Sequence, residues 1–321
     1  MNTLVPDQQL QAGIDGVLAW ENTDADGVGA VLDPVPQVTA TNAAGDVVID
    51  DVAATADPDV TGRYVVDVGG VDLGSDPDIL TVTWTRDDTT TAQTIVELVG
   101  RFLFTIRDAR QSYETLGSVE NYPTALIAKY RMIAENELMW VCDRSFVPRF
   151  RTVSIDGSGT RTILIPGDDH GGANELRTVR TATIDDSAIT AAELKVYQHR
   201  RVERERGDVW DQGQENCVLG YTYGLDSPYG DLKEAALERF RELLFMKTKA
   251  LPKNATSKSA DGTTVALKVD DYLTGNALVD AVYRRYSLRF SDLSGDAGPA
   301  AEPYGRSITF GRPDSLFHGG P

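Results

Sequence analysis

The sequence has no long apolar run and few cysteines, and these absences exclude several classes of protein. No segment of its 321 residues approaches the roughly 20 consecutive apolar residues that a membrane helix needs. The first residues, MNTLVPDQQLQAGIDG, lack the basic and apolar regions of a secretory signal, so we expect none. The two cysteines, Cys142 and Cys217, are too few for a disulfide framework. We expect both to be buried thiols in a reducing compartment.

Lysine is absent from the first 117 residues, and this part of the chain is strongly acidic. It contains five Arg and twenty Asp or Glu, a net charge of −15, whereas the whole chain carries −18. Such an acidic half is not expected to grip nucleic acid phosphates. Two interpretations remain: the charge keeps an exposed domain soluble, or it prevents adhesion to DNA nearby. Charge alone favours the first.

From Val17 to Val99 the chain consists of short runs with β-branched or aromatic residues at every second position. Clusters of Asp, Gly, Pro and Asn separate these runs, for example at residues 42–46. No segment of helical period lies between them, so the pattern predicts a small β-sandwich. It is immunoglobulin-like in architecture only, because no Cys-Trp-Cys arrangement is present.

After Thr105 the pattern changes to helices and a second group of strands. A short amphipathic segment is followed by a helix over residues 124–146, in which Pro123 suits the first turn and Pro148 prevents continuation. Its apolar stripe is predicted to be Ile127, Tyr130, Ala134, Leu138 and Val141. Residues 149–221 read mainly as strands, with residues 192–210 as one of them.

A second strong helix is predicted to begin at Asp231, which would cap it in a capping box with Glu234. Its buried stripe would be Leu232, Ala236, Phe240 and Leu243. A polar loop over residues 252–264 precedes a third helix near residues 275–290. The last 30 residues are rich in Gly, Pro and Ser, and form either a disordered tail or an arm that docks on a neighbour.

These patterns predict an α+β protein. We expect an Ig-like β-sandwich over residues 1–104 and a small helical-bundle core over residues 105–291. The core would contain a β-hairpin insertion at about residues 149–221. An extended C-terminal arm would follow at residues 292–321.

The stretch VLGYTYGLDSPYGDLKEAA, residues 218–236, has the strand, turn and helix layout of a phosphate loop or a nucleophile elbow. It lacks the Lys-Ser/Thr pair of a phosphate loop. Gly220 and Gly224 flank Thr222, but a β-branched threonine suits the strained elbow poorly. The three histidines, His170, His199 and His318, offer no obvious partner. We therefore expect no catalytic residue.

Metal sites are no better supported. The segment DDHGG at residues 168–172 offers adjacent ligands that cannot easily point at one ion. The segment NTDADGVG at residues 22–29 is a fragment of a calcium loop, but Val28 and Val35 stand where ligands belong. A looser Ca²⁺ site in the acidic loops stays open, yet the sequence gives no reason to expect a cofactor or a metal.

The run HRRVERERGD alternates in charge. At strand period Arg200, Arg204 and Arg206 would share one face of a hairpin arm. Such a face could meet acidic surface, and we interpret it as a solvated arm or a contact between subunits. The aromatic residues of a nucleic-acid reader are not interleaved with it.

Between Ser118 and Ala250 a predicted helix ends in CDRSFVPRF, a later strand carries ILIPG, and a further strand, NCVLGYTYG, runs through SPYGDLKEAALERF into a helix. This order of segments resembles the head-to-tail connector adaptor family of long-tailed bacteriophages. In that family a first helix closes in a Cys/Gly-Arg-x-Phe turn, a hydrophobic strand ends in Pro, and a later strand V-x-Y-x-x-G runs through Pro into DLK-x-A. The similarity covers about 130 residues. The matching positions are Cys142, Arg144, Ser145, Phe146, Ile163, Leu164, Ile165, Pro166, Val218, Tyr221, Gly224, Pro228, Asp231, Leu232, Lys233 and Ala235.

The resemblance implies a non-enzymatic virion protein, assembled in the bacterial cytoplasm and located in the neck. It would form a ring, usually of twelve copies, between the portal and the stopper or tail-completion protein. DNA would pass through without sequence readout, and no membrane is involved. The arm would engage the portal or a neighbouring subunit, with Ser307, Ile308, Thr309 and Phe310 as one anchoring strand. The sandwich lies outside the minimal family pattern. The alternatives are a stopper, a terminator, a minor capsid protein or a β-sandwich binding module.

Overall fold

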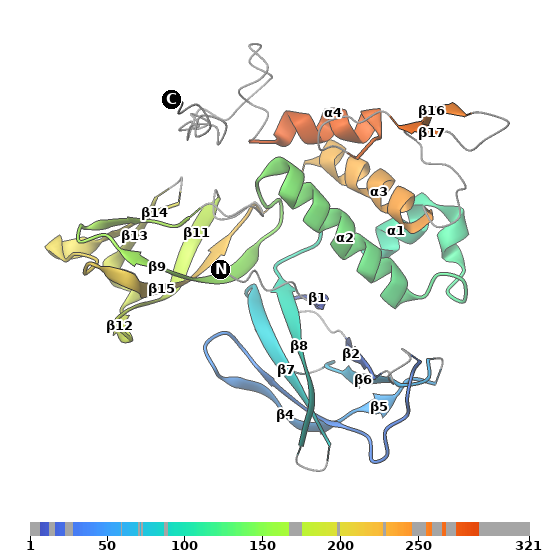
Figure 1. Cartoon of the computed structure of the whole chain (residues 1–321), viewed down its shortest axis with the longest axis horizontal. Helices are drawn as coiled ribbons and strands as arrows, with labels where there is room; N and C mark the ends of the chain where they lie inside the picture. The colour runs from blue at the N-terminus through green and yellow to red at the C-terminus, as the bar shows by residue number, and fades with distance from the viewer. Residues whose placement is uncertain are drawn as a thin grey trace, which may run out of the picture.

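The computed structural model describes most of the chain. The described residues are 7–12, 17–22, 28–58, 60–69, 71, 73–86, 89–166, 175–197, 200–226, 229–245, 255–258, 265–267 and 274–288. The predicted anchoring strand Ser307, Ile308, Thr309 and Phe310 lies outside these ranges, as do all three histidines. The mixed α+β class is confirmed, since several sheets occur together with helices. Figure 1 shows three parts: a β-sandwich below, a group of helices above it, and a second β-unit to the left.

The N-terminal sandwich consists of two sheets. Its strands are β1 (Gln8–Gln11), β2 (Val17–Glu21), β3 (Gln37–Thr41), β4 (Val47–Ala53), β5 (Thr55–Ala56), β6 (Arg63–Asp67), β7 (Asp78–Arg86) and β8 (Thr89–Val99). One sheet has the order β1-β8-β7-β3-β4 and the other β2-β6-β5. Strand β1 is parallel to β8, and the other pairs are antiparallel.

Alternation along these strands creates a single apolar core between the two sheets. Leu18 and Tyr64 from the smaller sheet and Leu80 and Trp84 from the larger one are all at most 1% exposed and belong to one cluster. The Trp20 ring, centred 5.6 Å from the Trp84 ring, joins the same core. Burial of these side chains supplies the main stabilisation of the sandwich.

The described residues of the helical core form four α-helices. They are α1 (Ile106–Ser112), followed by the 3₁₀ turn η1 (Glu114–Gly117), then α2 (Thr124–Cys142), α3 (Gly230–Phe245) and α4 (Ala277–Tyr286). The predicted stripe of α2 is buried, with Tyr130 half-buried. It packs on the stripe of α3 and on Tyr283 of α4. No helix in the described part of the chain combines the length and apolar character that crossing a bilayer requires.

The ends of the helices differ from the sequence-based expectation. Helix α2 ends at Cys142, because Asp143 adopts a left-handed conformation (φ 55°), so the chain turns before it reaches Pro148. Pro123 is the N-cap residue of α2 rather than a residue of its first turn. The complete capping box is formed at α1, where Thr105 and Asp108 bond each other's backbone N–H groups.

The predicted capping role of Asp231 is wrong. Helix α3 begins at Gly230, so Asp231 lies inside the first turn. Its carboxylate instead accepts a hydrogen bond from Tyr286 Oη at 2.7 Å and pairs with Arg285 at 2.8 Å. Asp231 therefore connects α3 to α4. The polar loop expected between these helices contains two short antiparallel strands, β16 (Ala255–Lys258) and β17 (Val265–Leu267).

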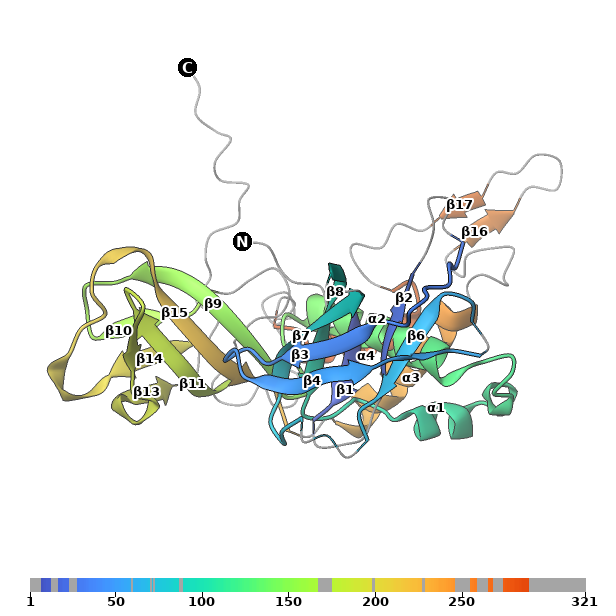
Figure 2. The ribbon, with the colours of Figure 1, turned by 90° about the horizontal axis from the view of Figure 1, so that it is seen from below.

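The second β-unit is inserted between α2 and α3. It spans nearly the range predicted for the hairpin insertion, residues 149–221, but contains more strands than a single hairpin. Its strands are β9 (Arg149–Gly157), β10 (Thr162–Leu164), β11 (Leu176–Ile184), β12 (Ser187–Ile189), β13 (Leu194–Tyr197), β14 (Arg201–Arg204) and β15 (Gly213–Tyr223). They form one sheet of order β12-β11-β15-β9 and another of order β10-β14-β13. Its core includes Val202, Trp210, Cys217 and Leu219, each fully buried. Figure 2 shows this unit extending away from the helices.

Candidate functional site

The residues considered for chemistry do not come together in the described part of the chain. No group of three or more His, Cys, Asp or Glu there could hold a metal ion. The segment 168–172 and the residues 23–27 of the calcium-like fragment lie outside the described ranges. Thr222 is 8% exposed, and its hydroxyl is paired with Thr178 Oγ1 across the sheet at 2.6 Å. The Thr222 hydroxyl therefore makes a buried contact between two strands. It is not exposed as the nucleophile of an elbow would be, so the GYTYG stretch resembles that motif in sequence only.

Two of the three segments that carry the family resemblance, the turn after α2 and the end of β15, meet where the helical core joins the second β-unit. We call this place the hub and define it as residues 142–150 and 221–226. The third segment, which includes Ile163 and Leu164, lies on β10 and pairs with β14 instead. Cys142 Sγ donates to the Tyr283 carbonyl of α4 (3.4 Å), and the Cys142 carbonyl accepts from Leu288 N (2.9 Å). Burial raises the pKa of this thiol well above its usual value, so it stays protonated. Both cysteines are free and buried, as predicted.

Arg144 and Ser145 hold the two β-strand connections of the hub. Arg144 pairs with Glu175 at 2.7 Å, just before β11. The Ser145 hydroxyl donates to the Val147 carbonyl (2.7 Å), and the Ser145 carbonyl accepts from Leu225 N (3.2 Å). These contacts join the exit of α2 to the strand that leads into α3. Burial raises the pKa of the Glu175 carboxyl to about 7 despite the arginine.

Gly224 permits the closest approach in the hub. Its φ of +96° is unfavourable for any residue with a side chain, and a Cβ atom there would clash with the Val147 carbonyl oxygen. Its own N–H donates to the Glu175 carbonyl at 3.0 Å. The end of β15 and the start of β9 can therefore cross only at a glycine. The stretch 218–236 is a structural junction, with β15 on one side and α3 on the other.

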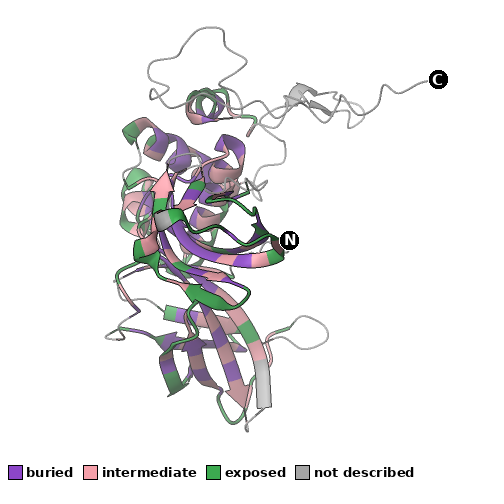
Figure 3. Ribbon diagram, turned by 90° about the vertical axis from the view of Figure 1, so that its left-hand side faces the viewer, coloured by how far each residue is buried: buried purple, intermediate pink, exposed green. Residues whose placement is uncertain are grey.

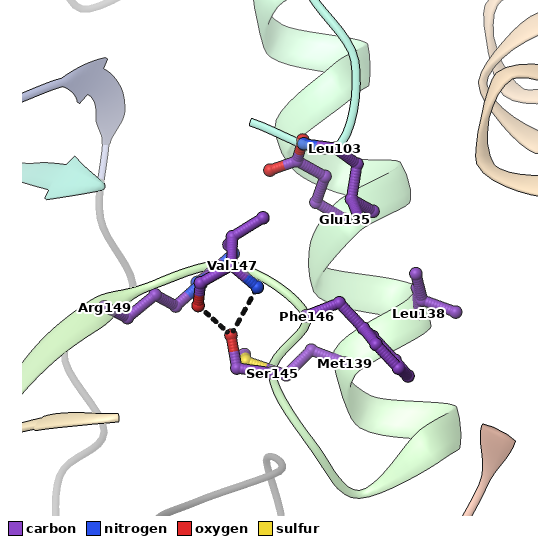
Figure 4. Close-up of a pocket in the computed structure, with 8 residues that line it drawn as sticks. All are labelled: Leu103, Glu135, Leu138, Met139, Ser145, Phe146, Val147 and Arg149. Carbon is purple, nitrogen blue, oxygen red and sulfur yellow. Dashed lines mark hydrogen bonds between the residues drawn. The ribbon is translucent and has the colours of Figure 1, made fainter. Parts of the chain in front are cut away.

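Under the hub lies a small cavity, shown in Figure 4, between α2 and the start of β9. Its volume of about 10 Å³ is near the minimum for one water molecule, so it is not a substrate pocket. Glu135 and Arg149 line it together with apolar side chains. Glu135 Oε1 accepts from Leu103 N at 2.8 Å. Burial raises the pKa of this carboxyl to about 7, although Arg131 and Arg149 act against the rise.

The predicted arginine face is wrong. Strand β14 covers only Arg201 to Arg204, while Arg200 lies in the preceding turn (φ 65°) and Arg206 in the 3₁₀ turn η3 (Glu205–Gly207). The strand is too short for a period of two to extend over seven residues. The Arg204 side chain makes a hydrogen bond within the subunit, because it donates to the Val209 carbonyl at 2.6 Å. A role of this hairpin in subunit contacts stays a prediction.

Sequence reasoning missed the charged residues beneath the hub. Arg131 and Glu135 interrupt the apolar positions of α2, and both are at most 5% exposed. The Arg131 guanidinium lies 3.2 Å from the centre of the Phe102 ring, and burial lowers its pKa to about 10. The sequence did contain a signal for this buried cluster, namely charged residues at positions of the apolar stripe of α2. Charged side chains are seldom buried at such positions unless they are paired in the fold.

No family model and no curated protein matches the sequence. Among the solved structures that are similar to the chain are a particle neck and a pilin subunit. The first, the neck of an empty GTA particle computed with C6 symmetry, has a TM-score of 0.37 at 14% identity and covers 58% of this chain and 89% of that one. The second, a variant of BcpA, the major pilin subunit of Bacillus cereus, has a TM-score of 0.17 at 10% identity and covers 68% and 61%. Both TM-scores are too low to define a shared fold.

Proposed function

We propose that the protein is a non-enzymatic structural component of a phage-like virion neck, acting as a head-to-tail connector adaptor. In this proposal copies of the chain assemble into a ring of about twelve. The ring sits between the portal and the stopper or tail-completion protein and extends the DNA channel. The observation that carries the proposal is the hub, where two of the three segments that resemble the adaptor family, the turn after α2 and the end of β15, are in contact. Arg144 and Ser145 bind the strand connections there, and Gly224 allows these connections to cross.

Two further properties support a conduit rather than a reader of DNA. The part of the chain that contains the sandwich carries a net charge of −15, which opposes adhesion to the phosphate backbone. The free buried thiols suit assembly in the reducing cytoplasm of a host bacterium. Neither property requires a cofactor, and the proposal includes none.

The direct test is to mix the purified protein with purified portal rings and to image the product. We expect a ring of the protein on one end of the portal, with the same rotational symmetry throughout. Native mass spectrometry gives the copy number. A protein that stays monomeric and unbound at high portal concentration contradicts the proposal. A ring that binds a tail protein but no portal favours a stopper or a terminator instead.

The C-terminal arm is tested separately, because the ring could form without it. Deletion of residues 301–321 should weaken attachment to the portal. The matched control replaces Ser307, Ile308, Thr309 and Phe310 by an equally long Gly-Ser segment, which keeps the length of the arm. Equal loss in both variants identifies these four residues as the anchor. Unchanged attachment in the deletion variant removes the arm from the proposal.

A further inference from the structure

The N-terminal sandwich meets the second β-unit through buried charges. Glu97 of β8 and Arg149 of β9 are 6% and 3% exposed. Arg149 Nη1 lies 3.3 and 3.2 Å from the two carboxylate oxygens of Glu97. Gln9 of β1 donates to the same carboxylate at 2.6 Å, and Arg149 Nη2 donates to Asn136 of α2 at 3.1 Å. One arginine therefore contacts the sandwich and the helical core together.

A second pair lies beside the first. Arg180 of β11 donates to the Pro77 carbonyl at 2.6 Å and pairs with Asp78 at 3.1 Å. Its guanidinium lies 4.7 Å from the centre of the Phe150 ring, which orients it. Asp78 is the first residue of β7 and is 6% exposed. The two carboxylates come from the acidic sandwich, and the two arginines come from the second β-unit.

The chain segment that links the sandwich to the helices is also fixed in place by contacts. Gly100 N donates to the Pro148 carbonyl at 2.9 Å, and a Cβ at Gly100 would press on the Pro148 ring at 2.8 Å. Arg101 donates to the Asp226 carbonyl, and Leu103 N to Glu135. The segment after β8 is thus bound to the hub and to α2 at successive residues. Figure 3 shows that buried residues occur both in the helices and in the strands.

We propose that the pairs Glu97–Arg149 and Asp78–Arg180 form a latch that holds the sandwich at one fixed orientation on the rest of the chain. Buried ion pairs add little to stability compared with apolar packing, but breaking one leaves an uncompensated buried charge. A different orientation of the sandwich would break both pairs at once. The sandwich is therefore a rigid part of the subunit rather than a tethered binding module. In an assembly its exposed aspartates, among them Asp46, Asp50 and Asp51, would therefore keep a fixed position relative to the helices.

The test measures the distance between the sandwich and the helices. Spin labels are placed at Ala44→Cys and Lys129→Cys, both exposed, in the full chain; the native thiols are buried and serve as the unlabelled background. Double electron–electron resonance should give one narrow distance peak for the otherwise unchanged protein. In the double variant Arg149→Gln/Arg180→Gln we expect this single peak to be lost and replaced by a broad distribution. Arg63→Gln, which removes an ion pair with Asp57 inside the sandwich, should leave the narrow peak unchanged.

If the double variant fails to fold by circular dichroism, the single variant Arg180→Gln takes its place, since this side chain is 32% exposed and its loss is better tolerated. It should broaden the peak less than the double variant. A broad distribution in the parent protein overturns the latch. A narrow peak in the folded variants overturns it too. None of these measurements requires a portal, so the latch and the adaptor proposal can fail independently.

Discussion

The two β-parts of the molecule are built alike but attached differently. Each has two sheets around its own apolar core, which includes the fully buried Trp84 in the sandwich and Trp210 in the second β-unit. The sandwich joins the described remainder through the segment after β8 and through side-chain pairs. The second β-unit is connected to the helices at both ends, through α2 and α3, and the hub fixes both connections. The sandwich is therefore a part added at one end of the helical core, whereas the second β-unit is built into that core.

The largest effects should come from the two apolar cores. Trp84→Ala and Phe240→Ala each remove a fully buried ring, and we expect each to cost about 3–5 kcal/mol. If the sandwich is a separate cooperative unit, Trp84→Ala should increase hydrogen exchange in β2 to β8 while α2 and α3 stay protected. Phe240→Ala should do the reverse. Equal loss of protection everywhere in both variants would show one cooperative unit and abolish the distinction.

Next in size is the backbone crossing of the hub. Gly224→Ala combines an unfavourable φ with a clash against Val147, and we expect it to cost more than about 2 kcal/mol. Gly45→Ala is the matched control in the sandwich. Gly45 has a similar φ of +89° and no atom near its Cβ position, so only the strain of about 1 kcal/mol applies. Urea denaturation measures both. Equal losses of stability in the two variants would mean that the Val147 carbonyl does not restrict the space at residue 224.

A pH effect should distinguish the helical core from the sandwich. The pKa of Glu135 is raised from 4.5 to about 7 by burial, in a setting that includes Arg131, Arg149 and Glu97. Between these two pH values the unfolded chain loses this proton while the folded chain keeps it. The stability from this group is therefore present below pH 4.5 and lost as the pH rises through 7.

Glu135→Gln should remove this decline, which we expect to amount to about 1–3 kcal/mol. Denaturant unfolding at pH 5 and pH 8 is the measurement, with exposed Glu120→Gln as the control. A residual slope is expected from Glu175, whose pKa burial also raises to about 7. An identical slope in the variant and the parent would contradict the assignment.

The smallest effect concerns the start of the helical core after the sandwich. Thr105→Ala removes the side-chain cap of α1 and should cost about 1 kcal/mol. Thr105→Ser keeps the hydroxyl and should be close to neutral. Thermal unfolding of the two variants gives the difference. A cost shared by Ser and Ala would point to lost packing of the threonine methyl group instead.

Much of the secondary structure was readable from local patterns. Helices α2, α3 and α4 followed from period and length, and most sandwich strands followed from alternation between turn residues. The errors lie where a local signal competed with contacts distant in sequence. Aspartate is a residue type that often caps helices, but the carboxylate of Asp231 is bound by Arg285 and Tyr286 instead. The arginine run has strand period, but a turn on each side limits β14 to four residues.

The sequence by itself determined the class of fold, the apolar faces of the helices, the burial of both cysteines and the acidity of the first part of the chain. These properties depend on residue type and spacing, which act over one or two turns of structure. Only the tertiary structure decided that Glu97 and Asp78 meet Arg149 and Arg180, that Gly224 crosses Val147, and that Glu135 is buried under the hub. The residues next to a charged side chain in the sequence do not reveal its ion-pair partner, because the pairing depends on which distant segments the apolar cores bring together.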